Sequence, residues 1–420
     1  MKTPHYVMLS SDYSAQEPRL TAYISGDHKM IQSFKDDRDI YGSIASISFG
    51  VPYEECLEFH PETHEYQPEG KARRTEAKSV LLGICYGRSV QTIADQLYGN
   101  ENISDEAKIK KAQNVYDSVL TSFPALRDLM NASQKHAKDY GYVETILGRR
   151  RHIPDMQLPK FEFVAEPGYM NPDIDPLDID TLDNKETIPS RVIEQLTKEF
   201  ESYKYFGQIV KRTNELKEQH IKVINNTRKI TDASRKCVNS TIQGSAAEQT
   251  KLAMLLIENN QEWKDIGGRI IIPVHDELIA EVPAEYWEEG AKILSSLMCE
   301  AANFLPFPSK CDVEVSYRWY GLSYPCKYPK PSSLDDLSEE EIKWVQYHLI
   351  ECEYPMPKIK FDPDEKLRGD RALGINGIES NEFVNAINDY INRYNITRDE
   401  FIDHIETKVN TGHIPTRRNK

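Results

Sequence analysis

The sequence lacks the features of a membrane-spanning or secreted protein. No stretch of the 420 residues approaches the roughly 18 consecutive apolar residues that a transmembrane helix needs. The N-terminal segment 1–14 has no apolar run of signal-peptide length. The 7 cysteines are scattered, with neither a CxxC pair nor the spacing of zinc ligands, which favours reduced thiols. We therefore expect a cytoplasmic protein that has no membrane partner.

An excess of positive charge is also absent. The chain has 52 Lys and Arg residues against 67 Asp and Glu residues, so its net charge is −15. This balance argues against a protein that coats nucleic acid, but an enzyme can hold DNA in a locally basic cleft. Eight of the carboxylates fall within residues 157–190, a proline-rich stretch that lacks the glycine and final glutamate of an EF-hand. We interpret this stretch as a solvated acidic loop.

The pattern of apolar residues predicts a mixture of helices and strands. A separate C-terminal piece, 323–420, is predicted to be a linker with one short helix at 338–350 and a terminal helical hairpin, whose second helix begins with a capping box at Thr397 and Glu400. The other predicted elements are a strand at 6–10 that runs into Asp12, helices at 72–98 and 105–140, a hairpin at 142–153, polar helices at 190–228, a helix at 232–258, two strands at 270–282, a helix at 284–303 and a strand at 312–319.

Three short blocks contain the residues that are best suited to chemistry. The first, DYSAQEPR at 12–19, places Asp12 at the end of a strand, where it presents a carboxylate at the rim of a sheet or simply caps a helix. The third, VHDE at 274–277, places acidic residues in the turn of an apolar hairpin, which suits a divalent cation or an exposed charged turn.

The second block, RRTEAKSVLLGICYG at 73–87, combines two cations, an apolar residue and an aromatic residue on one helix face. Such a face suits a triphosphate that lies along the helix with a base near the aromatic end, and it equally suits a solvated basic surface. The four residues of this face are Arg74, Lys78, Leu82 and Tyr86.

The order and spacing of the three blocks resemble family A DNA polymerases, the bacterial repair-polymerase type. That family has DYSQIELR where this chain has DYSAQEPR, RRxxAKxxxFGxxYG where it has RRTEAKSVLLGICYG, and an identical VHDE. GYVETILGRRRHIPD at 141–155 is similar to the segment that closes the family's fingers. The helix that contains Arg235, Asn239 and Gln243 is similar to its minor-groove helix. The resemblance covers about residues 5–156 and 231–322.

The resemblance implies an α+β right-hand polymerase fold, with a palm built from an antiparallel sheet and helices, and with helical fingers. It implies template-directed DNA synthesis from dNTPs on primed DNA, with two-metal phosphoryl transfer to the primer 3′-hydroxyl and release of pyrophosphate. The implied domains are palm at 1–30, fingers at 31–156, an acidic loop and helical insertion at 157–230, palm at 231–322, and a linker and helical extension at 323–420.

The family's roles carry over to the matching positions. Two Mg²⁺ ions would be held by Asp12, Asp276 and the backbone carbonyl of Tyr13, with Glu277 as a supporting carboxylate. The remaining implied roles are phosphate binding by Arg74 and Lys78, protonation of the leaving group by Lys78, stacking by Tyr86, a steric gate against ribose at Glu17, contact with the primer terminus by His275, and minor-groove contacts by Arg235, Asn239 and Gln243.

Several positions depart from the family pattern. Tyr41 occupies a phosphate-contacting position that is often His, and its phenol can donate one hydrogen bond but carries no charge. Leu82 occupies a position that is often Phe or Tyr and that influences sugar discrimination, so use of dideoxynucleotides is expected to be poor. Residues 157–230 exceed the family's connection by roughly 60 residues. Because the chain begins about a dozen residues before Asp12, the thumb and exonuclease are expected to be absent.

That short beginning favours one half of a split polymerase, with a second polypeptide that supplies the thumb and exonuclease, over a fragment of a longer gene. A bacteriophage source, and hence the host-cell cytoplasm, is expected by analogy. A single-subunit RNA polymerase is disfavoured by Glu17, since RNA synthesis needs space at that position. A non-catalytic or partner-dependent replisome subunit that retains the motifs is the alternative.

Overall fold

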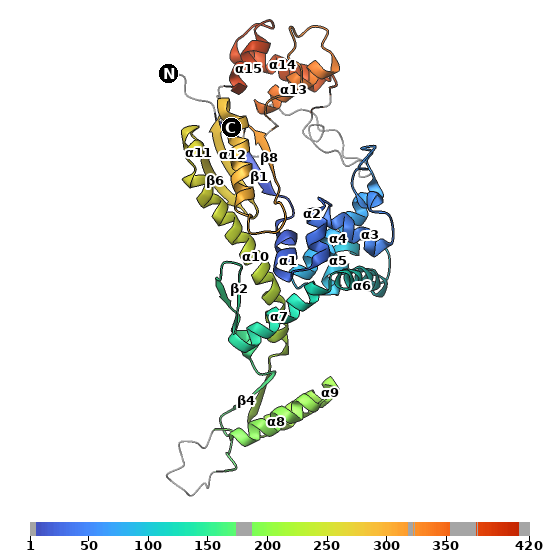
Figure 1. The fold of residues 1–420 in the computed structure, drawn as a ribbon. Helices are drawn as coiled ribbons and strands as arrows, with labels where there is room; N and C mark the ends of the chain where they lie inside the picture. The colour runs from blue at the N-terminus through green and yellow to red at the C-terminus, as the bar shows by residue number, and fades with distance from the viewer. Residues whose placement is uncertain are drawn as a thin grey trace. The chain divides into compact units, whose positions relative to one another are not determined.

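The computed structural model describes residues 6–173, 187–317, 322, 324–352, 375 and 377–410. The chain forms two compact units, which we call the sheet unit (Met1–Gln16 and Ala246–Lys420) and the helical unit (Glu17–Ser245). Figure 1 shows the elements of both units. Across the described residues, none of the helices combines the length and apolarity that a membrane crossing requires.

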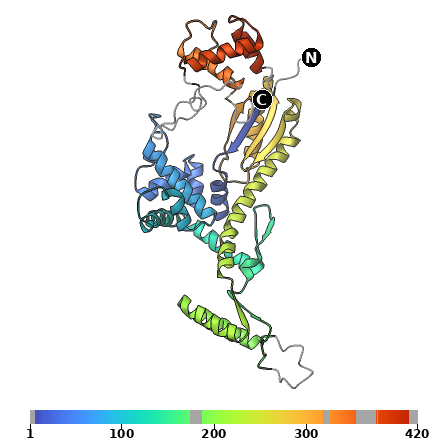
Figure 2. The same cartoon turned by 180° about the vertical axis from the view of Figure 1, so that it is seen from behind.

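The sheet unit is built on four antiparallel strands in the order β6-β7-β1-β8. Alternation along the central strand turns Val7, Leu9 and Tyr13 into the core and leaves Ser10 and Asp12 on the opposite face. Helix α12 (Trp287–Glu300) covers the apolar face (Figures 1 and 2). The strands are β1 (Tyr6–Tyr13), β6 (Arg269–Val274), β7 (Glu277–Pro283) and β8 (Cys311–Ser316).

Several helices of the helical unit pack against α4 (Pro68–Cys85), whose apolar side is buried through Ala77, Leu81 and Ile84. The predicted helix 72–98 is wrong in one respect, since the chain leaves the helix at Gly87, where φ is +64°. The predicted helix 105–140 is likewise interrupted, because Pro124 cannot continue a helix. The other elements are α1 (Gln16–Ser25), α2 (His28–Lys35), α3 (Ile40–Phe49), α5 (Val90–Tyr98), α6 (Asp105–Ser122), α7 (Pro124–Tyr140), β2 (Tyr142–Glu144) and β3 (Arg150–His152).

The sequence predicted a loop at 157–190 followed by polar helices at 190–228. The described residues of this region contain more regular structure than that. Strand β4 (Phe161–Ala165) pairs with β5 (Ile221–Asn225), and α8 (Ser190–Ser202) and α9 (Phe206–Glu218) pack on this pair around a separate core that includes Phe200. The sequence prediction missed both strands because each is five residues long and its partner lies far away in the chain. The aspartate-rich segment 174–186 lies outside the described residues.

Helix α10 (Thr227–Asn259) contributes to both units, with residues before Ala246 in the helical unit and the rest in the sheet unit. In the C-terminal region, α13 (Glu339–Glu351) packs against α14 (Asn381–Tyr394) and α15 (Phe401–Asn410) around one apolar cluster. The predicted hairpin of two helices therefore includes a third helix. The capping box is confirmed, since Thr397 and Glu400 exchange hydrogen bonds.

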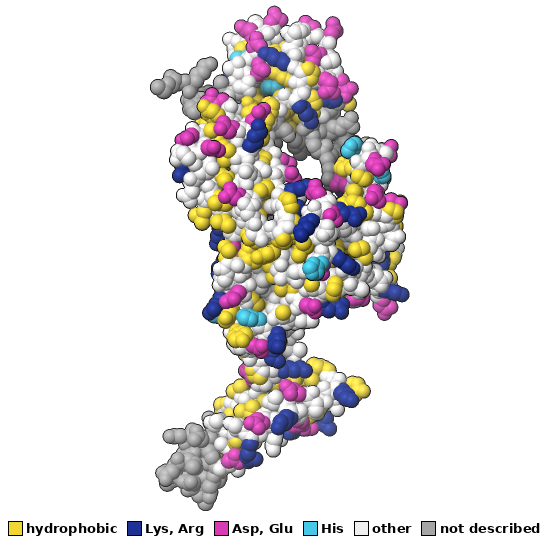
Figure 3. All heavy atoms as spheres, in the orientation of Figure 1, with side chains coloured by type: hydrophobic (Ala, Val, Ile, Leu, Met, Phe, Trp, Pro, Cys, Tyr) yellow, Lys and Arg dark blue, Asp and Glu magenta, His cyan; other side chains and the backbone are white. Residues whose placement is uncertain are grey.

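Surface charge is mixed rather than segregated on the face that Figure 3 presents. Lys and Arg side chains alternate with Asp and Glu side chains across it, although the net charge is −15. A local arrangement of charges, rather than the total, therefore has to account for any nucleic-acid binding.

Candidate active site

A group of carboxylates lies at one end of the sheet, on the face opposite the core. Asp12, the penultimate residue of β1, is paired in register with Glu277 on β7 and with Asp312 on β8. Side chains that are directly opposite one another on neighbouring strands project from the same face. We call these residues, together with Asp276, the acidic cluster.

The turn between β6 and β7 completes this cluster. Val274 pairs with Glu277, so His275 and Asp276 form a two-residue hairpin loop. His275 adopts φ +57°, the left-handed conformation that such tight loops require at their first position. The backbone N–H of Tyr13 donates to the carbonyl of Asp276 at 3.3 Å, which ties the turn to the end of β1.

Electrostatics in the acidic cluster favour the binding of a cation. Burial, followed by the negative charges of Asp276 and Glu277, raises the pKa of Asp12 to about 6. The hydroxyl of Ser10 donates a hydrogen bond to Glu277 and so fixes this carboxylate beside Asp12. Carboxylates that repel one another and are held by the fold are stabilised by a positive ion, and oxygen ligands suit Mg²⁺.

The cluster is not a complete protein cage for a metal. Within the described ranges, no three His, Cys, Asp or Glu side chains are arranged to hold an ion by themselves. Mg²⁺ is commonly bound through one or two carboxylates, with water and substrate phosphates as the other ligands. Asp12 and Asp276, together with the exposed face around them, fit this mode of binding.

In the helical unit, α4 presents a second charged group, which includes Arg74 and Lys78. Arg74 donates from Nε and Nη2 to Oδ2 of Asp39, at 3.0 and 2.7 Å. The ring of Tyr41 lies 5.2 Å from the Arg74 guanidinium carbon and 5.6 Å from Lys78 Nζ. Lys78 is exposed and forms no ion pair with any residue that the structure describes. The four side chains, Asp39, Tyr41, Arg74 and Lys78, are called the Arg74 cluster below.

Tyr86 lies about two helical turns beyond Lys78 and contacts Glu17, the candidate steric gate. Burial and a hydrogen bond to the carboxylate of Glu17 both raise the pKa of the Tyr86 hydroxyl. The same hydroxyl also meets the side chain of Gln243 from α10. Glu17, in the first turn of α1, is thus held beside the aromatic end of the α4 face. Leu82 lies between the two groups and is half-buried.

Close packing between α4 and α10 depends on Gly87. A Cβ atom at this position would lie 2.6 Å from the carbonyl oxygen of Arg235, so no larger residue fits without movement. Arg235 itself is exposed and pairs with Asp232 at 3.5 Å. One turn further along α10, Oδ1 of Asn239 is buried and has no hydrogen-bond partner in the described part of the chain.

The structure thus gathers the candidate residues into two sets. The sheet unit contains Asp12, Tyr13, His275, Asp276 and Glu277, and the helical unit contains Glu17, Tyr41, Arg74, Lys78, Leu82, Tyr86, Arg235, Asn239 and Gln243. Three polar neighbours were missed from the sequence: Ser10, Asp39 and Asp312. Ser10 had a signal, since it lies two residues before Asp12 on the same strand face, whereas the other two depend on long-range pairing.

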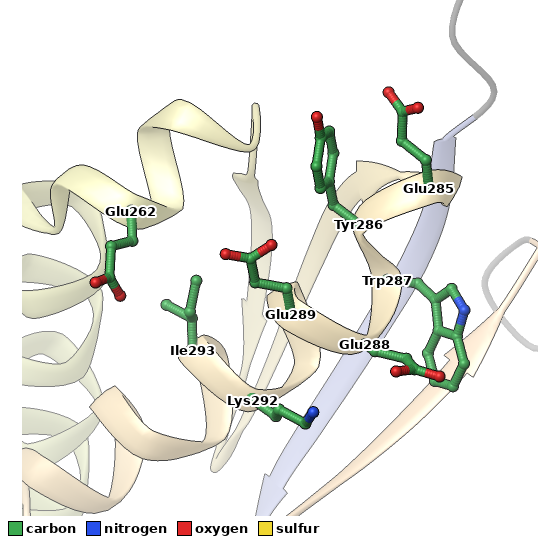
Figure 4. A pocket seen from close by; sticks show the side chains of 8 residues that line it. All are labelled: Glu262, Glu285, Tyr286, Trp287, Glu288, Glu289, Lys292 and Ile293. Carbon is green, nitrogen blue, oxygen red and sulfur yellow. The ribbon is translucent and has the colours of Figure 1, made fainter.

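A surface pocket in the sheet unit lies apart from these residues. It has a volume of about 510 Å³ and lies between α11 (Gln261–Asp265) and α12. Figure 4 shows Glu262 opposite Glu289 and Ile293, and the lining includes two further glutamates but a single lysine, Lys292. A predominantly acidic lining disfavours a nucleotide, so the pocket is not a candidate for the triphosphate site.

Comparison with known proteins identifies the family. The family model described as DNA polymerase family A matches residues 1–167 and 188–321. The chain therefore belongs to family A of the DNA polymerases. The expected combination of helices with an antiparallel sheet is confirmed by the strand order and pairings described above.

The relatives are bacterial DNA polymerases I. Identity is 24% over 320 residues with the enzyme of Chloroflexus aurantiacus, which covers 76% of this chain and 25% of the relative. It is 27% over 314 residues with that of Lactococcus lactis subsp. lactis, which covers 75% and 26%. It is 25% over 314 residues with the thermostable enzyme of Thermus aquaticus, which covers 75% and 27%. The chain therefore spans about a quarter of the length of these relatives.

A solved structure is similar as well. It is the POL domain of Pol1 from M. smegmatis in complex with DNA primer-template and dNTP. The TM-score is 0.48 at 24% sequence identity, and the match covers 76% of this chain and 41% of that one.

Proposed function

We propose that this chain is the palm and fingers part of a DNA-directed DNA polymerase. It would add a dNMP to the 3′-hydroxyl of a primer, as the template directs, and release pyrophosphate. The observation that carries the proposal is the acidic cluster, in which Asp12 is paired with Glu277 and meets Asp276 from the turn. We propose residues 1–30 and 231–322 as palm, 31–156 as fingers, 157–230 as an insertion and 323–420 as an extension.

Two Mg²⁺ ions are the proposed cofactor, in keeping with the metal dependence that is general in this family. Asp12 and Asp276 would bind them, with the backbone carbonyl of Tyr13, and Ser10 would keep Glu277 oriented as a supporting carboxylate. When bound, the ions would lower the pKa of the primer hydroxyl and neutralise the charge of the triphosphate and pyrophosphate.

The Arg74 cluster would bind the incoming nucleotide. Arg74 is suited to two phosphate oxygens because its guanidinium is planar and permanently charged. Lys78 carries an exposed ammonium group that no described carboxylate pairs, which would bind the phosphates and give a proton to the leaving pyrophosphate. Tyr86 would stack near the nascent base pair and, through its hydrogen bond, hold Glu17 where a ribose 2′-hydroxyl would clash.

Primed DNA and dNTPs are the proposed substrates. Arg235, Asn239 and Gln243 recur every fourth residue on α10 and would read minor-groove acceptors, which vary little between base pairs. His275, exposed at the tip of the hairpin, would contact the primer terminus. None of the comparisons supports the second polypeptide that the short N-terminal segment led us to expect.

Primer extension by the purified chain tests the proposal. Wild-type chain and the Asp276→Ala variant would be assayed with Mg²⁺, a primed template and dNTPs, with circular dichroism as a check of folding. We expect extension by the wild type and a loss of at least about a thousandfold in the variant. Equal extension by a folded Asp276→Ala variant would contradict the proposed site. Absence of extension by the wild type would favour the non-catalytic subunit.

A further inference from the structure

Asp39 occupies a fixed position at the start of α3. Its Oδ1 accepts a hydrogen bond from the backbone N–H of Gly42 at 2.7 Å, so the side chain caps the helix. Its own backbone N–H donates to the hydroxyl of Tyr53 at 2.8 Å. The capping bond therefore fixes the carboxylate of Asp39, and the hydroxyl of Tyr53 fixes the backbone of the same residue.

The second oxygen of this carboxylate holds one edge of Arg74. Oδ2 accepts from both Nε and Nη2, and the two side chains are only 30% and 29% exposed. The ring of Tyr41 supports the face of the same guanidinium at 5.2 Å. Arg74 is thus fixed by its edge and by its face. Of its five N–H donors, the three that Asp39 does not engage remain for a ligand.

We propose that Asp39 is a positioning residue, which sets the guanidinium of Arg74 to receive the phosphates of the incoming dNTP. The inference rests on the proposed role of Arg74 in nucleotide binding. A flexible arginine loses conformational entropy when it binds phosphate, and a preformed ion pair removes part of that loss before the ligand arrives. The ion pair with Asp39 also compensates the charge of Arg74. Lys78 is then the cation of this cluster that forms no ion pair with a carboxylate among the described residues.

The variant Asp39→Asn separates the two functions of the side chain. Asparagine keeps an oxygen for the Gly42 N–H, so α3 remains capped, but it removes the negative charge that orients Arg74. We expect the dissociation constant and the KM for dNTP to rise about tenfold, with kcat changed by less than about threefold. In the Arg74→Ala background the same substitution should cause no further rise.

A matched control is available at the preceding helix. Asp27 caps α2 by accepting from the N–H groups of Lys29 and Met30 at 3.0 and 3.1 Å. Asp27→Asn is therefore the same chemical change at the same type of cap, away from the arginine. It should leave dNTP affinity unchanged. Asp39→Ser, which retains a capping oxygen but is too short to reach Arg74, should behave like Asp39→Asn.

Equilibrium dialysis with dATP and Mg²⁺ measures affinity without requiring synthesis, and primer extension then gives KM and kcat. Weaker binding by folded Asp39→Asn and Asp39→Ser, absent in the Arg74→Ala background, would support the inference. Wild-type affinity in Asp39→Asn, or tighter binding because the carboxylate competes with phosphate, would overturn it while leaving the proposed function intact. Failure of the wild-type chain to bind dATP would overturn both.

Discussion

Replacing Asp12 by asparagine should stabilise the metal-free protein in the same variant that loses DNA synthesis. Burial and the charges of Asp276 and Glu277 raise the pKa of Asp12 from 3.8 to about 6 in the folded chain. Between these two values the folded state holds a proton that the unfolded state has lost. Stability therefore falls as the pH rises from about 4 to about 6, and the loss persists at higher pH.

The size of this effect follows from the same values. A carboxyl pKa raised from 3.8 to about 6 corresponds to about 3 kcal/mol at pH 8. The fold desolvates the Asp12 carboxylate only in part, since the residue as a whole is still exposed, and solvent screening reduces the expected effect to about 1 kcal/mol. The asparagine of the Asp12→Asn variant carries no charge at any pH, so the variant should exceed the wild type in stability by about this amount at pH 8 and by almost nothing near pH 4.

Urea unfolding with a metal chelator, at both pH values, measures the difference. Glu314→Gln is a suitable control because Glu314 lies on the same sheet face, but its charge is not among those that raise the pKa of Asp12. Mg²⁺ should then stabilise the wild type and not Asp12→Asn. A variant that is less stable than the wild type at pH 8, or one that Mg²⁺ stabilises equally, would refute the reasoning.

Two further predictions concern the helical unit. Glu17→Ala should increase the use of ribonucleotides relative to deoxyribonucleotides, because it removes the carboxylate held by Tyr86. Single-nucleotide incorporation measures the ratio, and an unchanged ratio would exclude the gate role. Gly87→Ala should cost at least about 2 kcal/mol in urea unfolding, because φ is +64° and the new Cβ would lie 2.6 Å from the Arg235 carbonyl. Gly148→Ala, with φ +82° and no atom within 4 Å of the Cβ, should cost only about 1 kcal/mol, and equal costs would contradict the close-packing argument.

Local patterns in the sequence predicted the parts of the site that lie within single elements. The strand that ends near Asp12 and the hairpin with His275 and Asp276 at its turn were predictable, because alternation and a short polar break define them. The α4 face was predictable from four-residue spacing, although the end of that helix at Gly87 was not. The helix ends where Gly87 adopts φ +64°, and the four-residue spacing of the face does not reveal this backbone conformation.

Residues that are joined by pairing across the chain were not predictable. Asp312 lies opposite Asp12 only because β8 pairs with β1 in one register, and no local pattern specifies that register. Asp39 was not predicted either, because its contact with Arg74, 35 residues away, is tertiary. The pairing of β4 with β5 was also missed because the two strands are far apart in the chain. In addition, the proline-rich sequence after β4 suggested a loop.

Template-directed choice of nucleotide is the most direct test of a polymerase assignment. Four primed templates that differ only in the first unpaired base would each be given the four dNTPs separately, with Mg²⁺, and pyrophosphate release would be measured alongside primer length. We predict that each template supports addition of its complementary nucleotide, with one pyrophosphate released per nucleotide added. Addition that ignores the template base, or addition without pyrophosphate, would contradict the account.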